Sequence, residues 1–201
     1  MLRTAAVLLT SLICWTAAAN AQAPEIGQRA PDSAVVDSQG KTRRISDFHG
    51  KVVVLEWTNA DCPYTRKHYS GGNMQSLQTL AQENGVIWLS VISSAPGKQG
   101  YVSGAGADEL TRARGASPTA VLLDSEGKLG RLYSAKTTPH MFVIDPNGVL
   151  RYMGGIDSIA TAEIADIPAA EPYLKEAMLE VVQGKPVSHP VTRPYGCSVK
   201  Y

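Results

Sequence analysis

KVVVLEWTNADCPYTRKHY, residues Lys51 to Tyr69, is the stretch that decides the fold. Its apolar run from Val52 to Leu55 is typical of a parallel strand that is buried on both faces. A polar loop follows, and the segment from Tyr64 to Glu83 has apolar residues at helical spacing. The stretch therefore predicts a strand, a loop and the start of a helix, with Cys62 at or near the helix N-terminus.

The rest of the chain continues this alternation of strands and helices. We expect a hairpin over 34–45, further strands in GVIWLSVIS, TAVLLD and HMFVIDPNGVLRYMG, and further helices over 107–114, 128–133 and 171–183. This order predicts an α/β fold: a central mixed sheet flanked by helices, with an N-terminal hairpin and a C-terminal tail. Right-handed crossovers then place the Cys62 loop at the carboxyl edge of a central strand, where chemistry is favoured.

The N-terminus has the three parts of a secretory signal peptide. A positively charged start precedes a mostly apolar run from Ala5 to Ala19, which is too short to span a membrane, and Ala19-Asn20-Ala21 is a cleavage signal. We predict a signal peptide over 1–21, a single domain over 22–184 and a tail over 185–201. The protein is then expected to be periplasmic or secreted, with no membrane association after cleavage.

Charge and cysteine content narrow the function classes. The chain has 19 Lys and Arg residues against 18 Asp and Glu, a formal net charge of +1, which gives no reason to expect a nucleic-acid partner. Cys14 lies in the predicted signal peptide, so Cys62 and Cys197 are the cysteines that remain. Two cysteines in an oxidising compartment suggest a single disulfide or a redox pair.

Cys62 has the surroundings of a reactive thiol. Unpaired N–H groups and the positive end of a helix dipole stabilise a thiolate at a helix N-terminus. Arg66 and Lys67 are expected to act in the same direction, whereas the adjacent Asp61 opposes them. We predict a thiol pKa below the usual value of about 8.5. The alternative is an inert, partly buried thiol.

The motif around Cys62 resembles that of the thioredoxin-like superfamily. W-x-x-x-x-C-P-Y-T ends at Thr65 on a strand-to-helix turn, and T-T-P-H opens a later strand at Thr137. That superfamily has C-x-x-C at the helix start and a cis-proline facing it, and Pro139 matches the proline. The resemblance implies a thioredoxin-like fold in which Thr138 presents its backbone to a substrate. It makes Thr138, Pro139 and Thr65 the candidate substrate-binding residues.

The resemblance extends over nearly all of the chain beyond the signal peptide. The leading hairpin, GKVVVLEW, DCPYTRKHY, the SSAPGKQGY loop and the terminal YGCSVKY are together similar to the peroxiredoxin-like branch of the redoxin group, the alkyl hydroperoxide reductase/thiol-specific antioxidant relatives. It implies an exported thiol-disulfide oxidoreductase or antioxidant-type redoxin. Such a protein uses no cofactor, and its partner is a thiol or disulfide substrate or a reductant protein.

Three positions depart from the patterns of these families. Thr65 stands where thioredoxins have their second cysteine, so no local C-x-x-C disulfide can form. The peroxiredoxin pattern P-x-x-x-T-x-x-C, placed on Cys62, finds Leu55 instead of proline and Asn59 instead of threonine. Efficient peroxidase chemistry is therefore not expected.

Glu56 ends the buried strand, where a carboxylate is costly unless it is paired or functional. Thioredoxins keep a buried carboxylate near this point to move protons, so the resemblance makes Glu56 the candidate proton acceptor beside Cys62. The plainer interpretation is a glutamate that pairs with an arginine or lysine, or that reaches solvent at the strand end.

Cys197 lies in a proline-rich tail for which no helix or strand is predicted. Three interpretations are open, because connectivity cannot be read from a sequence. Cys197 resolves a mixed disulfide on Cys62, or forms a permanent disulfide with it that holds the tail, or stays free or pairs with another chain. The first interpretation makes Cys62 and Cys197 the candidate catalytic residues.

Two other functions stay open at this point. One is a non-catalytic thioredoxin-fold binding module with a structural Cys62–Cys197 disulfide. The other is a copper-binding thioredoxin-fold protein, with Cys62, Cys197, His68 and His140 as candidate ligands. The chain lacks C-x-x-x-C and H-x-x-H spacing, so we predict no metal site. His68 is instead expected to be solvated on its helix. The sequence leaves the oligomeric state open.

Overall fold

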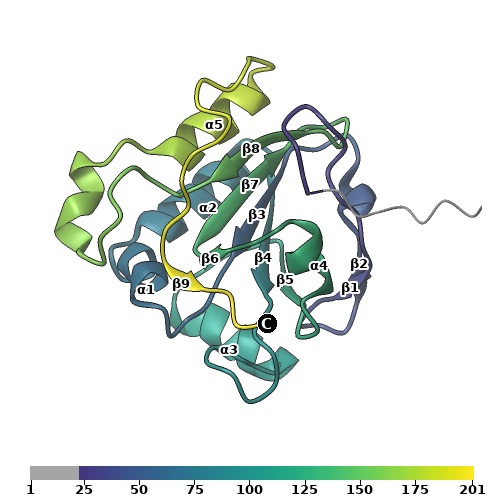
Figure 1. Cartoon of the computed structure of the whole chain (residues 1–201), viewed down its shortest axis with the longest axis vertical. Helices are drawn as coiled ribbons and strands as arrows, with labels where there is room; N and C mark the ends of the chain where they lie inside the picture. Colours follow the sequence, from purple (N-terminus) through teal and green to yellow (C-terminus); the bar gives the residue numbers. More distant parts are fainter. Residues whose placement is uncertain (1–22) are drawn as a thin grey trace, which may run out of the picture.

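The computed structural model describes residues 23–201 (Figure 1). The predicted signal peptide lies outside the described residues and stays a prediction. Within residues 23–201, no helix is long and apolar enough to cross a membrane.

A five-stranded mixed sheet forms the centre of the protein, in the order β5-β4-β3-β7-β8 (Figure 1). The three parallel neighbours are β3 (Val53–Trp57), β4 (Ile87–Ile92) and β5 (Ala120–Leu123). On the other side of β3, β7 (His140–Ile144) runs antiparallel to it and to β8 (Leu150–Gly154). The predicted α/β class and mixed sheet are confirmed.

The helices lie close to their predicted positions. They are α1 (Pro63–Ser70), α2 (Asn73–Glu83), α3 (Gly104–Ala113), α4 (Lys128–Leu132) and α5 (Tyr173–Val182). Gly72, at φ 73°, separates α1 from α2. The structure starts α3 earlier than predicted, because the Ser103 hydroxyl caps it by accepting from the Gly106 N–H. The 3₁₀ helices η1 (Ile45–Phe48) and η2 (Ile164–Ala169) were not predicted.

The side chains of β3 alternate between two apolar cores, one on each face of the sheet. Val54 belongs to the core under α2 and α5, whose members include Met74, Leu77, Leu174 and Met178. Val53, Leu55 and Trp57 belong to the core under η1, α4 and the N-terminal hairpin, with Val35, Ile45, Leu129 and Tyr133. The predicted hairpin is β1 (Val35–Val36) paired antiparallel with β2 (Thr42–Arg43). Glu56 therefore faces the α1–α2 side of the sheet.

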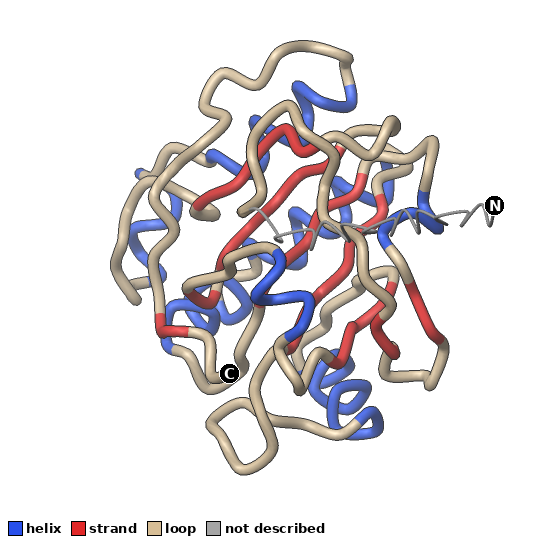
Figure 2. Tube along the Cα trace, turned by 45° about the vertical axis from the view of Figure 1, so that its right-hand side comes forward, coloured by secondary structure: helices blue, strands red, loops and turns tan. Residues whose placement is uncertain are grey.

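The tail is ordered against the sheet, so the prediction that it contains no strand is wrong. It first follows the edge of β8, where the Met153 N–H donates to Pro190 O at 3.0 Å. Then β9 (Cys197–Ser198) pairs antiparallel with β6 (Thr137–Thr138), and Cys197 stands opposite Thr138. Figures 1 and 2 both show β9 beside β6 at one end of the sheet. A two-residue strand is too short to produce an apolar period, so the sequence does not predict it.

The residues after Cys197 also bind the tail to the rest of the domain. Lys200 O accepts the Ala95 N–H at 2.8 Å, and the Tyr201 hydroxyl donates to Ala135 O at 2.9 Å. The Tyr201 ring lies on α4, because a Cβ on either Gly127 or Gly130 would overlap it. Cys197 is thus held from both sides along the chain.

Gly196 gives a test of this attachment. Its φ is 136°, and a Cβ there would overlap the Thr138 carbonyl oxygen, a backbone atom that cannot move aside cheaply. We expect Gly196→Ala to separate β9 from β6 while the central sheet stays folded. Hydrogen exchange should then speed up at the amides of residues 195–201 and at Ala95, whose N–H donates to Lys200 O, but not in the central sheet. Gly184→Ala is the matched control, since Gly184 also has a positive φ of 68° but open space around it. Equal tail protection in both variants would contradict the expectation.

Candidate redox site

Cys62 is the N-cap residue of α1, and Pro63 follows at the first helical position. The Cys62 carbonyl accepts the Arg66 N–H at 2.9 Å, which begins the helix, and the Cys62 N–H donates to Asn59 O at 3.1 Å. Pro63 has no N–H to leave unpaired there. The predicted position of Cys62, in the loop at the carboxyl end of β3, is confirmed.

The Cys62 thiol contacts two segments that are far away in the sequence. Its Sγ donates to Thr138 O at 3.0 Å and accepts the Cys197 N–H at 3.4 Å. The thiols of Cys62 and Cys197 also hydrogen-bond to each other. Both are free thiols, so the disulfide that the sequence suggested is not formed in this structure. Cys62 is completely buried, whereas Cys197 is partly exposed.

The two thiols have opposite pKa shifts. Burial raises the pKa of Cys62, but hydrogen bonds with the Cys197 thiol, with the Thr65 and Cys197 backbones and with Thr138 together outweigh it, so that this pKa lies below its ordinary value of 9.0. Burial, the hydrogen bond to Cys62 and the charge of Cys62 raise the pKa of Cys197 to about 11. Cys62 is therefore the more acidic thiol of the pair and Cys197 the less acidic one.

The direction predicted for the Cys62 pKa is confirmed, but not all of the expected causes are. Lys67 turns away from the thiol: its buried Nζ donates to Ile159 O at 3.0 Å and lies 3.7 Å from Asp157 Oδ2. Arg66 is exposed on the outer side of α1. A sequence places a lysine one turn from a thiol but does not say which way its long side chain runs.

The candidate copper ligands do not gather. His68 is completely buried rather than solvated as predicted, and burial lowers its pKa to about 4, with Lys67 adding to the effect and Asp157 opposing it. His140 is buried at the start of β7, and burial lowers its pKa to about 3. Within residues 23–201, no group of three or more His, Cys, Asp or Glu residues could hold a metal ion. The copper alternative therefore has no ligand set in this part of the chain.

Glu56 is completely buried, and three neutral side chains donate to it. The Tyr69 hydroxyl lies 2.9 Å from Oε1, and Trp88 Nε1 and Ser90 Oγ each lie 2.9 Å from Oε2. The plainer interpretation was wrong, because Glu56 neither pairs with an arginine or lysine nor reaches solvent. In the described part of the chain none of these bonds reaches Cys62. Glu56 ties α1 to β3 and β4, and its role as proton acceptor stays a prediction.

The predicted substrate-binding residues surround Cys62. The Thr138–Pro139 peptide bond is cis, in agreement with the match of Pro139 to the family's proline. Thr65 is buried on α1, and its backbone hydrogen-bonds to the Cys62 sulfur. The Thr138 backbone, where a substrate was expected, is occupied by Cys197 of the tail. Contacts of these three residues with a substrate stay a prediction.

Sequence reasoning missed the structural role of Asn59. Its Oδ1 accepts the Asp61 N–H at 2.9 Å, and its Nδ2 donates to Gln99 O at 3.3 Å. Asp61 Oδ2 in turn accepts the Gly100 N–H at 3.1 Å. The residue that departs from the peroxiredoxin pattern thus ties the Cys62 loop to the SSAPGKQGY loop. The long glycine-bearing loop therefore flanks the site.

Comparison with known proteins agrees with this geometry. A match to the AhpC/TSA family covers residues 26–153, more than half of the chain. The chain belongs to the AhpC/TSA family. The matched range includes Cys62 and Pro139 and ends before α5 and the tail.

Individual relatives of this AhpC/TSA chain are named as thiol-disulfide oxidoreductases or share its fold. The thiol-disulfide oxidoreductase ResA of Geobacillus kaustophilus (strain HTA426) is 26% identical over 133 residues, which are 63% of this chain and 67% of the relative. The structure of an uncharacterized conserved protein from Geobacillus kaustophilus matches with a TM-score of 0.74 at 19% identity, over 88% of this chain and 92% of its own. A Chlorobium tepidum protein described as thiol:disulfide interchange protein DsbE matches with a TM-score of 0.56 at 23% identity, over 81% and 98%. These likenesses confirm the thioredoxin-like fold.

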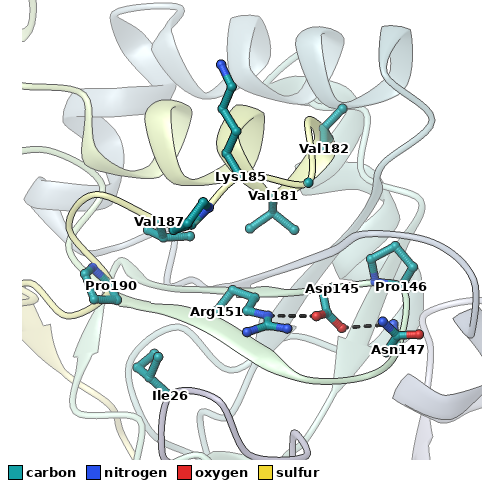
Figure 3. Close-up of a pocket in the computed structure, with 12 residues that line it drawn as sticks. Ile26, Asp145, Pro146, Asn147, Arg151, Val181, Val182, Lys185, Val187 and Pro190 are labelled. Carbon is teal, nitrogen blue, oxygen red and sulfur yellow. Dashed lines mark hydrogen bonds and ion pairs between the residues drawn. The ribbon is translucent and has the colours of Figure 1, made fainter.

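Two hollows of similar size lie on the surface of this family member, and one of them borders the redox site. That cavity, of about 700 Å³, is lined by Tyr64, Thr137 and Gly196 among others. The other, of about 680 Å³, lies under the end of α5, where Arg151 Nε donates to Asp145 Oδ2 at 2.7 Å (Figure 3). Asp145 follows the end of β7 that pairs with the start of β3, so this second hollow is at the opposite end of the sheet from Cys62.

Glu56→Gln should destabilise the protein by about 2 kcal/mol, because an amide nitrogen would replace an acceptor oxygen among buried donors. Urea unfolding measures this loss. Ser90→Ala is the control, since it removes one donor and leaves the carboxylate its other partners. The pH dependence of Cys62 alkylation tests the proton-acceptor role: the same profile in E56Q and wild type would leave Glu56 with a structural role only.

The pKa shifts of the thiols predict how the stability of the reduced protein depends on pH. The stability from Cys62 is present above its unfolded pKa of 9.0 and is lost as pH falls through its lower folded pKa. The stability from Cys197 is present below 9.0 and is lost as pH rises towards about 11. Relative to a Cys62→Ser/Cys197→Ser variant, the reduced protein is therefore expected to be most stable near pH 9. A flat difference between the two proteins would contradict the pKa assignment.

Proposed function

We propose that this AhpC/TSA family member is an exported thiol-disulfide oxidoreductase whose redox pair is Cys62 and Cys197. The observation that carries the proposal is the contact between the two cysteines, with the Cys197 N–H 3.4 Å from Cys62 Sγ. The opposite pKa shifts support it, since a redox pair needs one thiolate to attack and one thiol to give its proton. Export rests on the signal-peptide pattern of residues 1–21.

The proposed exchange has two steps. The Cys62 thiolate attacks one sulfur of a substrate disulfide, so that a mixed disulfide forms and the other substrate sulfur leaves as a thiolate. Cys197 then loses its proton to the leaving group and attacks Cys62 Sγ, which forms the Cys62–Cys197 disulfide and releases the second substrate thiol. Two electrons pass to the substrate, and an external dithiol must return them. With a dithiol as the partner, the same steps run in reverse, and the Cys62–Cys197 disulfide accepts two electrons from it.

Access to Cys62 requires the tail to move in this mechanism. Cys62 is completely buried, and the Thr138 backbone beside it is paired with Cys197. A substrate therefore reaches the thiolate when β9 has left β6. The cavity beside Gly196 and Thr137 would widen at that moment, because Gly196 forms part of its wall.

For this member of the AhpC/TSA family, peroxide reduction is less well supported than thiol-disulfide exchange. Leu55 and Asn59 occupy the positions where the peroxiredoxin pattern has proline and threonine, and Asn59 is already engaged with Asp61 and Gln99. The relative ResA is named for thiol-disulfide exchange, which is the chemistry that two adjacent cysteines can perform. We therefore expect Cys62-dependent peroxide turnover to be slow or absent.

Cys197→Ser tests the resolving role directly. Without the second thiol, a mixed disulfide between Cys62 and a substrate cannot be resolved within the chain, so the adduct should accumulate and be seen by mass spectrometry. Cys62→Ser is the control and should collect no adduct. An adduct-free C197S protein, isolated from cells that export it, would show that Cys197 does not resolve Cys62.

The reduction potential of the purified protein distinguishes a catalytic Cys62–Cys197 disulfide from a permanent structural one. Structural disulfides lie below about −300 mV, whereas exchange catalysts lie above this value. A value well below it would exclude the catalytic proposal and favour the binding module with a structural disulfide.

A further inference from the structure

The proposed redox pair works only if the tail returns Cys197 to its position against Cys62. Tyr195 is the buried tail residue next to this position. Tyr195 lies two residues before Cys197 and is only 8% exposed, although its segment has no regular structure. Its ring stands edge-on to Tyr64 on α1, with 5.9 Å between the ring centroids. The inference below rests on the proposed function, because it concerns the same pair of cysteines.

The Tyr195 hydroxyl joins two buried groups from distant parts of the chain. It donates to Asp157 Oδ1, in the loop after β8, and lies 3.1 Å from His68 Nε2 on α1. The other ring nitrogen, Nδ1, is 2.9 Å from the Asn73 amide nitrogen, which is a donor. His68 is neutral near pH 7, since its pKa is about 4, so its proton lies on Nε2. His68 therefore donates to Tyr195, which donates to Asp157.

A buried ion pair completes this group of side chains. Asp157 is 5% exposed and Lys67 is 2% exposed, and Lys67 Nζ lies 3.7 Å from Asp157 Oδ2. The same Nζ is 5.7 Å from the Tyr195 ring centroid, within the range of a cation–π contact. Buried charges of this kind are stable only with their partners in place. We name these four side chains the tail anchor: Lys67, His68, Asp157 and Tyr195.

We propose that Tyr195 is a positioning residue, which through the tail anchor holds Cys197 against Cys62. It is the member of the anchor that the tail contributes, and it touches no reacting atom. The single residue between Tyr195 and Cys197 is Gly196. Its backbone packs so tightly against Thr138 O that there is no room for a Cβ, so the position of Tyr195 fixes the position of Cys197. The anchor thus raises the effective concentration of the Cys197 thiol at Cys62 and favours the disulfide by the same factor.

Tyr195→Phe is the test, because it keeps the ring and removes the hydroxyl. The His68 Nε2–H then loses its partner in a buried site, and Asp157 Oδ1 loses one of its two donors, keeping the Ile159 N–H at 3.1 Å. In glutathione redox buffers, the equilibrium constant for the Cys62–Cys197 disulfide should fall by up to about tenfold, the size of one such bond, because the docked fraction of the reduced tail falls. In the reduced protein, Cys62 should react faster with iodoacetamide, because the tail leaves it more often.

Tyr133→Phe is the matched control. Tyr133 is 1% exposed, and its hydroxyl donates to Pro31 O at 2.8 Å, on a different segment from the tail. Both variants should lose unfolding free energy in urea, but only Y195F should shift the disulfide equilibrium and the alkylation rate. A wild-type equilibrium in Y195F would overturn the positioning role, and so would an equal shift in Y133F.

The two proposals can fail separately. If the wild-type protein forms no Cys62–Cys197 disulfide, the proposed function fails. The alkylation rate of Cys62 still tests the positioning role of Tyr195 in that case, because an unchanged rate in Y195F overturns it. If Y195F does not fold, His68→Leu removes the donor to Tyr195 and the acceptor of the Asn73 amide, but leaves the bond of Tyr195 to Asp157. H68L should shift both readouts in the same direction by less, and wild-type values in folded H68L would overturn the proposal.

Discussion

The antiparallel pairing of Thr138 with Cys197 is the constraint on which the site depends. It brings together two cysteines that are 135 residues apart in the sequence, and it places the Cys197 N–H on the Cys62 sulfur. The same pairing covers Cys62, so the contact that completes the proposed redox pair also keeps a partner from reaching it. In the proposed exchange, access to Cys62 depends on how readily a two-residue strand opens and closes.

Helix α1 carries Cys62 at its N-cap, and two buried carboxylates hold its other turns in place. Tyr69 donates to Glu56 on β3, while the residues just before it, Lys67 and His68, meet Asp157 in the loop after β8. Polar groups of this kind are stable in an interior only when each has its partner. Because Glu56 and Asp157 come from separate segments, the helix has little freedom to shift or turn.

Periodicity and turn residues were sufficient to predict the sheet, its mixed direction, the helices and the position of Cys62. The buried run of β3 and the helical spacing of the apolar residues after it are strong local signals. The site was predicted in part. The motif pointed to Cys62 and Pro139, but the partners of Glu56, the burial of His68 and the turn of Lys67 towards Asp157 are tertiary contacts without a sequence period. The strand β9 escaped prediction because two residues carry no pattern, and Tyr195 because a single tyrosine in a proline-rich tail is a weak signal.

The AhpC/TSA match ends at residue 153, so the two thiols belong to different parts of the chain. Cys62 lies within the matched family domain. Cys197 lies in the tail, outside the five-stranded central sheet. In the proposed mechanism, the attacking and the resolving thiol are therefore carried by separate parts of the chain. A tail that keeps Tyr195 and β9 but has no cysteine would leave the core and its cover in place and Cys62 without a second thiol in residues 23–201, and its chemistry would then be set by whichever external thiol meets it.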